Sequence, residues 1–211
     1  MKVVAFNGSP RKEGNTYHAI KVVAAELEKE GIEVEIVHVG NKVIRGCMAC
    51  GGCIRNQNEQ CVMKNDEVNE WIQKMKDADG IILGSPVHCA AIGGTMKSFL
   101  DRAFYVAAVN NDMFRHKVGV SVVADRRAGG VPVFDQLNNF MNHSEMIMPT
   151  SNYGNIAYGT APGEVTQDEE GMQIMRILGK NMAWLMKVIE AGKPYVKENE
   201  QEEKIFTNFI R

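Results

Sequence analysis

The stretch KVVAFNGSPRKEGNT, residues 2–16, decides the fold. It begins with an uninterrupted run of β-branched and apolar residues, which is typical of a strand that is buried on both faces of a sheet. A loop rich in Gly, Ser and Asn follows, and the next apolar residues recur at helical spacing until Gly31. A buried strand that passes through a short loop into a helix is the first half of a βαβ unit.

The rest of the chain repeats this alternation of strands and helices. Further strands are predicted at residues 33–39, 80–86, 117–124 and 145–151. Further helices are predicted at residues 65–78, 93–104, 131–144 and 167–191. This alternation indicates right-handed crossovers and a parallel sheet that helices cover on both faces. The predicted fold is therefore α/β and flavodoxin-like, with a five-stranded parallel sheet in the order 2-1-3-4-5.

Length and composition predict one domain over residues 1–211. The chain has 211 residues, of which 45% are hydrophobic and 24% are charged, as is usual for a globular protein. Within this domain we expect a cysteine-rich insert at about 45–63 and a charged C-terminal tail at about 197–211. The apolar end of that tail, IFTNFIR, could dock on a neighbouring subunit.

Charge and hydropathy argue against several classes of partner. The formal net charge of −2 offers no electrostatic attraction to nucleic acid or to an anionic membrane. No apolar run approaches the roughly 20 residues that span a bilayer, and the first residues show no signal pattern. We therefore expect a cytoplasmic protein, in which thiols stay reduced and clustered cysteines more often serve metal or redox chemistry than disulfides.

The loop after the first strand is a candidate phosphate site. In an open α/β sheet, ligands bind beyond the carboxyl ends of the strands, close to the point where the strand order reverses. Backbone N–H groups at a helix start, with hydroxyl and guanidinium donors, suit an anion. The side-chain candidates are Ser9, Arg11, Asn15 and Thr16. The loop matches neither G-x-G-x-x-G nor the P-loop pattern. The alternative is a simple βα turn in which Ser and Asn only cap the helix.

Two more loops end at the same edge of the predicted sheet. The loop after the third strand, GSPVHCAAIGGTMKSFLDR, supplies Pro86, Val87, His88 and Cys89 as a candidate wall for a flat ring. Its two glycines would let the backbone approach that ring. His88 could instead be an ordinary edge residue, and Cys89 a small packing residue. The loop after the fourth strand adds Arg126 and Gly129, and its arginines meet either an anionic ligand or solvent.

Together these loops carry a family resemblance. GSPRKEGNT, the cysteine-rich insert and GSPVHCAAIGGTMKSFLDR resemble, in this order, the NADPH-dependent FMN reductase superfamily and, within it, the iron–sulfur flavoproteins of anaerobic archaea and bacteria. The resemblance implies FMN, with its phosphate in the first loop and its isoalloxazine ring against the second. Members of the family often have Tyr at the position of His88. The resemblance also implies a homodimer or a homotetramer.

The cysteine-rich insert has the spacing C-x2-C-x2-C-x7-C, formed by Cys47, Cys50, Cys53 and Cys61. Three cysteines at this close spacing with a remoter fourth favour a [4Fe–4S] cluster, whereas zinc sites more often use two separated C-x2-C pairs. Zinc, and free thiols or disulfides, stay open as alternatives. The iron–sulfur branch of the family carries its compact cysteine motif at this place in the chain.

The predicted function is an FMN-dependent electron-transfer flavoprotein that couples flavin to a [4Fe–4S] cluster and to a carrier such as ferredoxin. The alternative is an NAD(P)H-dependent FMN or quinone reductase whose cysteine motif is structural or vestigial. A regulatory module that binds flavin or metal is a third reading. Because hydride chemistry resides on the flavin, no side chain is expected to be catalytic. The sequence leaves open the physiological donor and acceptor, and whether electrons pass within or between subunits.

Overall fold

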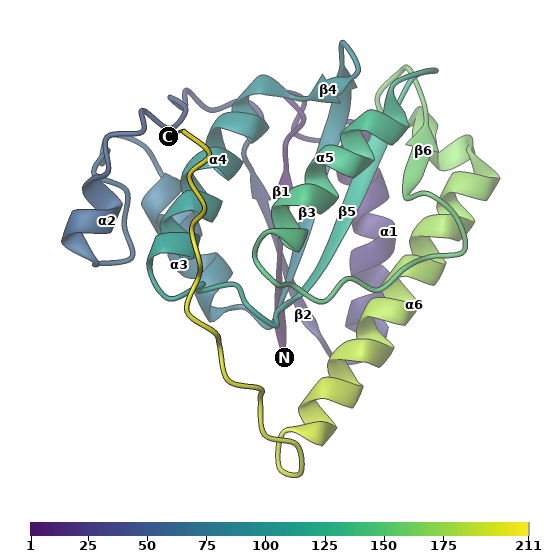
Figure 1. Cartoon of the computed structure of the whole chain (residues 1–211). Helices are drawn as coiled ribbons and strands as arrows, with labels where there is room; N and C mark the ends of the chain where they lie inside the picture. The colour runs from purple at the N-terminus through teal and green to yellow at the C-terminus, as the bar shows by residue number, and fades with distance from the viewer. Residues whose placement is uncertain (211) are drawn as a thin grey trace.

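A twisted sheet crosses the middle of the molecule between two layers of helices in the computed structural model, which describes residues 1–210 (Figure 1). The parallel strands lie in the order β2-β1-β3-β5-β6. Their bounds are β1 (Lys2–Asn7), β2 (Glu33–His38), β3 (Gly80–His88), β5 (Val118–Asp125) and β6 (Ile156–Tyr158). The predicted flavodoxin-like order of five parallel strands is therefore confirmed.

The predicted helices are confirmed as α1 (Asn15–Lys29), α3 (Val68–Asp77), α4 (Gly94–Val109), α5 (Gly130–Asn142) and α6 (Glu169–Gly192). The structure adds two short helices that the sequence does not predict, α2 (Gly52–Asn56) and the 3-10 helix η1 (Glu164–Gln167). Helices α1 and α6 cover one face of the sheet, and α3, α4 and α5 cover the other (Figure 1). Among the described residues, no helix combines the length and the apolar character that crossing a bilayer requires.

The strand predicted at residues 145–151 is wrong. In this segment only Ile147 bridges to Val118, at the beginning of β5. Pro149 follows, and because proline has no N–H to donate to a ladder, pairing does not continue. The outer parallel strand is β6, which pairs with the far end of β5 from Val123 to Asp125.

The structure also contains a strand that the sequence does not predict. Strand β4 (Ala91–Ile92) pairs antiparallel with the extended end of β3, so that His88 lies opposite Ala91. The two residues of the turn, Cys89 and Ala90, have φ angles of 51° and 57°. Two successive positive φ values are characteristic of a tight hairpin turn whose twist suits the flanking strands. The predicted loop after the third strand is therefore largely a β-hairpin.

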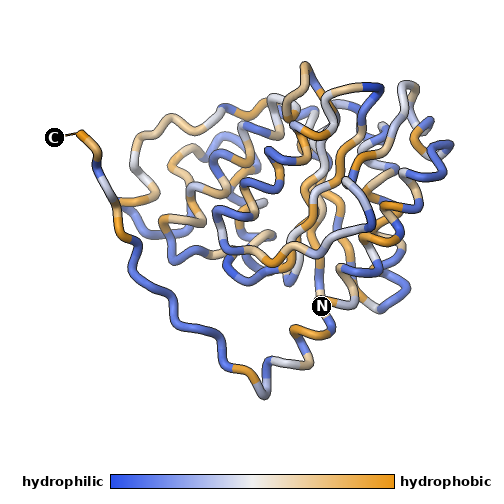
Figure 2. Tube along the Cα trace, turned by 45° about the vertical axis from the view of Figure 1, so that its right-hand side comes forward, coloured by the Kyte–Doolittle hydropathy of each residue, from blue (hydrophilic) through white to orange (hydrophobic). Residues whose placement is uncertain are grey.

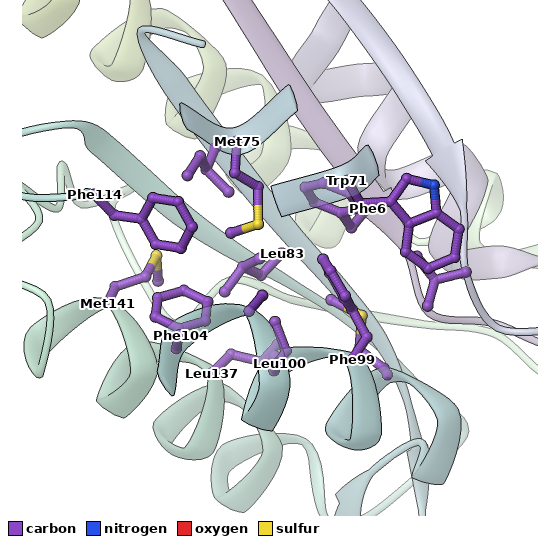
Figure 3. Packing of buried hydrophobic residues seen from close by; sticks show 14 of the residues in the cluster. Phe6, Trp71, Met75, Leu83, Phe99, Leu100, Phe104, Phe114, Leu137 and Met141 are labelled. Atoms are coloured by element: carbon purple, nitrogen blue, oxygen red, sulfur yellow. The ribbon is translucent and has the colours of Figure 1, made fainter. Parts of the chain in front are cut away.

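Alternate residues of the central strands enter two separate cores. Val4 and Phe6 of β1 face the layer of α3, α4 and α5, while Val3 and Ala5 face α1 and α6. In the first core the Phe6 and Phe99 ring centroids lie 4.8 Å apart, and Trp71 meets Phe99 edge to face (Figure 3). A strand buried on both faces explains why the apolar run near the N-terminus is continuous rather than alternating.

Three further predictions concern the methionines of α6, the number of domains and the C-terminal tail. The methionines of α6 face the second core, which agrees with a packing role rather than a cofactor role. That residues 1–211 form a single domain stays a prediction. The tail predicted at 197–211 follows α6 and is bonded to the body, because Arg115 donates to the Asn199 carbonyl and both Gln201 and Lys204 donate to Asp112. Its last residue, Arg211, lies outside the described residues.

Candidate functional site

A cleft of about 240 Å³ lies beyond the carboxyl ends of β1, β3, β5 and β6. Eight of the ten residues that the sequence assigns to a cofactor line it: Ser9, Arg11, Asn15, Thr16, Pro86, Val87, His88 and Arg126. The cleft does not include Cys89 or Gly129. Because parallel strands bring their carboxyl ends to one edge, loops that are far apart in the sequence meet there.

The start of α1 is arranged for an anion. No side chain caps this helix, and the backbone of its N-cap residue, Gly14, is extended. The first N–H groups of a helix have no partner within it, so these donors are available at the cleft. Thr16 is 1% exposed, and its hydroxyl Oγ1 has no hydrogen-bond partner within residues 1–210. A buried hydroxyl without a partner beside free backbone donors fits the phosphate of FMN.

The loop that leads into α1 is held by neighbouring backbone. The Ser9 hydroxyl accepts a hydrogen bond from the Arg11 N–H at 3.2 Å, and the ring Nε2 of His38 lies 2.8 Å from the Ser9 carbonyl oxygen. Gly40 packs against the same segment so closely that a Cβ there would lie 2.2 Å from that oxygen. The chain that leaves β2 therefore fixes the phosphate loop, and only glycine fits at position 40.

Two predicted cofactor residues lie outside the lining of the cleft. Cys89 occupies the exposed tip of the β3–β4 hairpin, because the hairpin turn points it away from the sheet. Gly129 packs against the β3–β4 hairpin. Its φ is 103°, and a Cβ there would lie 2.9 Å from Ala90 Cα and from Val87 Cγ1. Gly129 thus permits a close approach of two loops.

The cleft includes three notable residues that sequence reasoning missed. Asp125 ends β5 and is 4% exposed; its Oδ1 accepts a hydrogen bond from the Arg127 N–H, while its Oδ2 has no partner among the described residues. Gly159 and Thr160 follow β6. The position of Asp125 at the end of a buried strand was a usable signal. Gly159 and Thr160 were missed because the last strand was misplaced.

The four cysteines of the insert line one small cavity on the α4 side of the molecule. The cavity is formed by Cys47, Met48, Cys50, Gly51, Cys53, Cys61, Val62, Met63, Arg102, Tyr105 and Val106. Gly51 has a φ of 66°, and a Cβ on Gly52 would lie 2.2 Å from Val62 Cγ1. These two glycines let the short helix α2 turn sharply and pack against the end of the insert.

The four thiols differ in exposure. Cys47 and Cys50 are exposed, Cys61 is partly buried and Cys53 is buried. Burial raises the pKa of the Cys53 thiol, and the nearby Cys61 and Cys47 raise it further, while two backbone N–H groups oppose the shift. All four are free thiols. Four thiols around one cavity are a donor set that suits an iron–sulfur cluster or zinc.

The thiols do not converge on one point. Within residues 1–210, no three His, Cys, Asp or Glu side chains lie close enough together to hold a single metal ion. The fit to a metal group therefore rests on the chemistry of the four donors and on their shared cavity.

Comparison with known proteins adds a sequence relationship. Residues 1–161 match the NADPH-dependent FMN reductase family. An iron–sulfur flavoprotein of Methanocaldococcus jannaschii is 36% identical over 197 residues, which cover 90% of this chain and 100% of that protein.

Solved structures share the fold. RosB with the bound intermediate 8-demethyl-8-formylriboflavin-5'-phosphate matches with a TM-score of 0.69 and 17% identity, over 100% of this chain and 94% of RosB. A flavodoxin from the domain Archaea matches with a TM-score of 0.57 and 16% identity, over 89% of this chain and 99% of the flavodoxin. At this level of identity, these two similarities concern the fold alone.

Proposed function

This chain belongs to the iron–sulfur flavoprotein branch of the NADPH-dependent FMN reductase family, and we propose that it couples FMN to a [4Fe–4S] cluster and to a one-electron carrier such as ferredoxin. It is an FMN-dependent oxidoreductase. The observation that carries the proposal is the separate grouping of two residue sets: the predicted FMN residues around one cleft, and the four cysteines around another cavity.

The chain's own groups at the cleft would bind and orient FMN. The free N–H groups at the start of α1, the Thr16 hydroxyl and the Arg11 guanidinium are donors for the phosphate. Pro86, Val87 and His88 offer a wall for the ring, and Arg126 adds a cation to the lining of the cleft. Bound FMN supplies both two-electron hydride chemistry and one-electron chemistry. The protein contributes position and electrostatics, and no side chain is assigned as a catalytic acid or base.

The cysteine cavity would hold the second redox group. Cys47, Cys50, Cys53 and Cys61 are the proposed ligands, and a cluster bound there transfers one electron at a time. Ala49 donates its N–H to Cys47 Sγ at 3.4 Å, so one backbone donor points at a proposed ligand sulfur. Hydrogen bonds to sulfur are among the factors that tune cluster potentials.

Anaerobic purification tests the proposal. We expect one FMN and about four iron and four sulfide per chain, with broad visible absorbance beyond that of the flavin and an EPR signal after reduction. Protein that contains FMN but no iron or sulfide after anaerobic preparation would reject the cluster and leave the flavoprotein assignment intact.

The second candidate is an NAD(P)H-dependent FMN or quinone reductase with a structural or vestigial cysteine motif. The NADPH-dependent activity in the family's name favours it. Stopped-flow mixing separates the two functions. Rapid bleaching of the flavin by NADPH supports the reductase, whereas reduction only by reduced ferredoxin supports the electron-transfer protein.

We further propose a cytoplasmic homodimer or homotetramer. Figure 2 shows the tail as a hydrophilic stretch with a hydrophobic end that stands away from the body. Ile205, Phe206, Phe209 and Ile210 are each at least 87% exposed. Large apolar side chains at this exposure are unfavourable in water, and a second copy of the chain would cover them. Light scattering on the full chain and on a chain ending at Glu203 tests this. The particles of the shorter chain should contain fewer copies of the chain.

A further inference from the structure

Arg102 of α4 lies outside the FMN cleft, and nothing in the proposed function uses it. Its side chain is 0% exposed and lines the cavity of the four cysteines. Burying a guanidinium is costly unless other groups satisfy its charge and its donors. The contacts of Arg102 therefore indicate what this buried cation does.

The two terminal nitrogens of Arg102 make four hydrogen bonds. Nη1 and Nη2 pair with the Asp66 carboxylate at 2.5 and 3.0 Å, in a bidentate arrangement. Nη1 also donates to the Arg45 carbonyl at 3.3 Å, and Nη2 donates to the Met63 carbonyl at 3.2 Å. Arg45 and Met63 are the two ends of the cysteine-rich insert. A single side chain thus ties both ends of the insert to α4.

The third nitrogen of Arg102 is left over. Its Nε is buried and has no hydrogen-bond partner within residues 1–210. Asp66 pairs with Nη1 and Nη2, so the Nε–H is a donor that the carboxylate does not use. An arginine guanidinium is not deprotonated in proteins. Arg102 and Cys61 both line the cavity, so a permanent cation with a spare donor lies at the site of the cysteines.

We propose that Arg102 is a positioning residue for the iron–sulfur cluster: it clamps the two ends of the cysteine-rich insert, and its cation favours the reduced cluster. This inference rests on the proposed function, because it assumes that the four cysteines hold a cluster. One-electron reduction adds a negative charge to the cluster, and a buried cation nearby stabilises that charge. The spare Nε–H can donate to sulfur, which acts in the same direction.

The test uses three variants and a matched control. Arg102→Lys keeps the charge but cannot reproduce the planar fork that reaches Asp66 and both carbonyls. Arg102→Gln alone would leave Asp66 buried and unpaired, so the neutral variant is the double substitution Asp66→Asn with Arg102→Gln. It is compared with Asp66→Asn alone, so that the two proteins differ only in the charge of residue 102. The control is Lys97→Gln, which removes a cation from the exposed side of α4, away from the cavity.

Two measurements on anaerobically purified full-length protein test the two roles of Arg102, its charge and its clamp on the insert. In an EPR-monitored redox titration, the equilibrium constant for cluster reduction should be at least about tenfold lower in the double variant than in Asp66→Asn, or about 59 mV for one electron. Arg102→Lys should stay within about threefold of wild type, because it keeps the charge. In hydrogen exchange, amides of residues 46–62 should exchange about tenfold faster in Arg102→Lys. FMN content and the flavin potential should not change in any variant.

Each outcome decides one role. A double variant with a full cluster and the same potential as Asp66→Asn would overturn the charge role, and wild-type exchange in Arg102→Lys would overturn the clamp. A shift in Lys97→Gln as large as the difference between the double variant and Asp66→Asn would also overturn the charge role, because the effect would not be specific to the cavity. Wild-type protein without iron would reject the cluster and the charge role together, while the exchange measurement would still decide the clamp.

Discussion

The FMN cleft and the cysteine cavity differ in how much of their geometry the polypeptide holds by itself. At the cleft, Ser9 and Thr16 are buried, and the loop between them is fixed by contacts with Gly40 and His38. At the cavity, Cys47 and Cys50 are exposed, whereas the second half of the insert is bonded to the body through Gln57, Glu59 and Cys61. An anion site made of helix N–H groups needs only the fold, whereas a site made of thiols on an irregular loop needs added restraints.

The largest expected effect comes from Gly40, which packs against the phosphate loop at the cleft. Gly40→Ala should weaken FMN binding about 100-fold, or about 2.7 kcal/mol, because the added methyl group cannot share space with the Ser9 backbone. Titration of metal-free protein with FMN, followed by fluorescence, measures this. Gly192→Ala is the control, since a Cβ there meets nothing within 4 Å. FMN affinity within about threefold of wild type would show that the cleft is less rigid than its contacts indicate.

A smaller effect is expected at Thr16, where one substitution should weaken FMN binding but stabilise the FMN-free protein. Thr16→Val should weaken FMN binding about tenfold, because a donor to the phosphate is lost. The same substitution should raise the free energy of unfolding of the FMN-free protein by about 1 kcal/mol, since the buried hydroxyl has no partner there. Thr16→Ser keeps the hydroxyl and should retain FMN affinity. Loss of both affinity and stability would mean that Thr16 is simply part of the core.

In metal-free protein, the stability lost when a cysteine is replaced should depend on how deeply that cysteine is buried, rather than on its role as a ligand. In metal-free protein, Cys53→Ala should cost about 1 kcal/mol of unfolding free energy, because Cys53 packs in the first core. Cys50→Ala should cost less than about 0.5 kcal/mol, since this thiol is exposed. Urea unfolding measures both values, and equal costs would contradict the uneven support of the insert. Under the proposed function, each variant also loses the full cluster.

The smallest effect is expected at Glu35 of β2, outside both regions. A hydrogen bond from Lys74 holds the pKa of Glu35 below its ordinary value of 4.5; burial opposes this, and Lys2 adds to the lowering. Because the pKa is lowered in the folded state, the ion pairs stabilise the protein above pH 4.5, and this is lost as the pH falls through the folded-state pKa.

Glu35→Gln should therefore cost about 0.5 kcal/mol at pH 7 and progressively less toward acidic pH, since partly exposed ion pairs contribute little. Thermal unfolding at several pH values measures this difference. FMN affinity should not change. A larger loss at pH 4 than at pH 7 would contradict the assigned sign.

A region was predicted well where the residues that define it are close together in the sequence. The phosphate loop lies within the first 16 residues, so strand, loop and helix start could be recognised together. The hairpin after β3 was missed because Cys89 and Ala90 lack the Asn-Gly or Asp-Gly pair that usually marks such a turn. Strand β6 has only three residues, and its pairing with β5 depends on a neighbour more than 30 residues earlier in the chain.

The sequence by itself determined the first four parallel strands and the helices that alternate with them, the loops that follow these strands and the spacing of the four cysteines. These features are local, because hydrophobic period, turn residues and ligand spacing act over a few residues. Only the tertiary structure decided that Thr16 is buried without a partner, that Gly40 touches Ser9, and that Arg102 reaches Asp66, 36 residues away in the chain. Burial and long-range pairing decide which polar groups stay unsatisfied, and those groups indicate where the cofactors would bind.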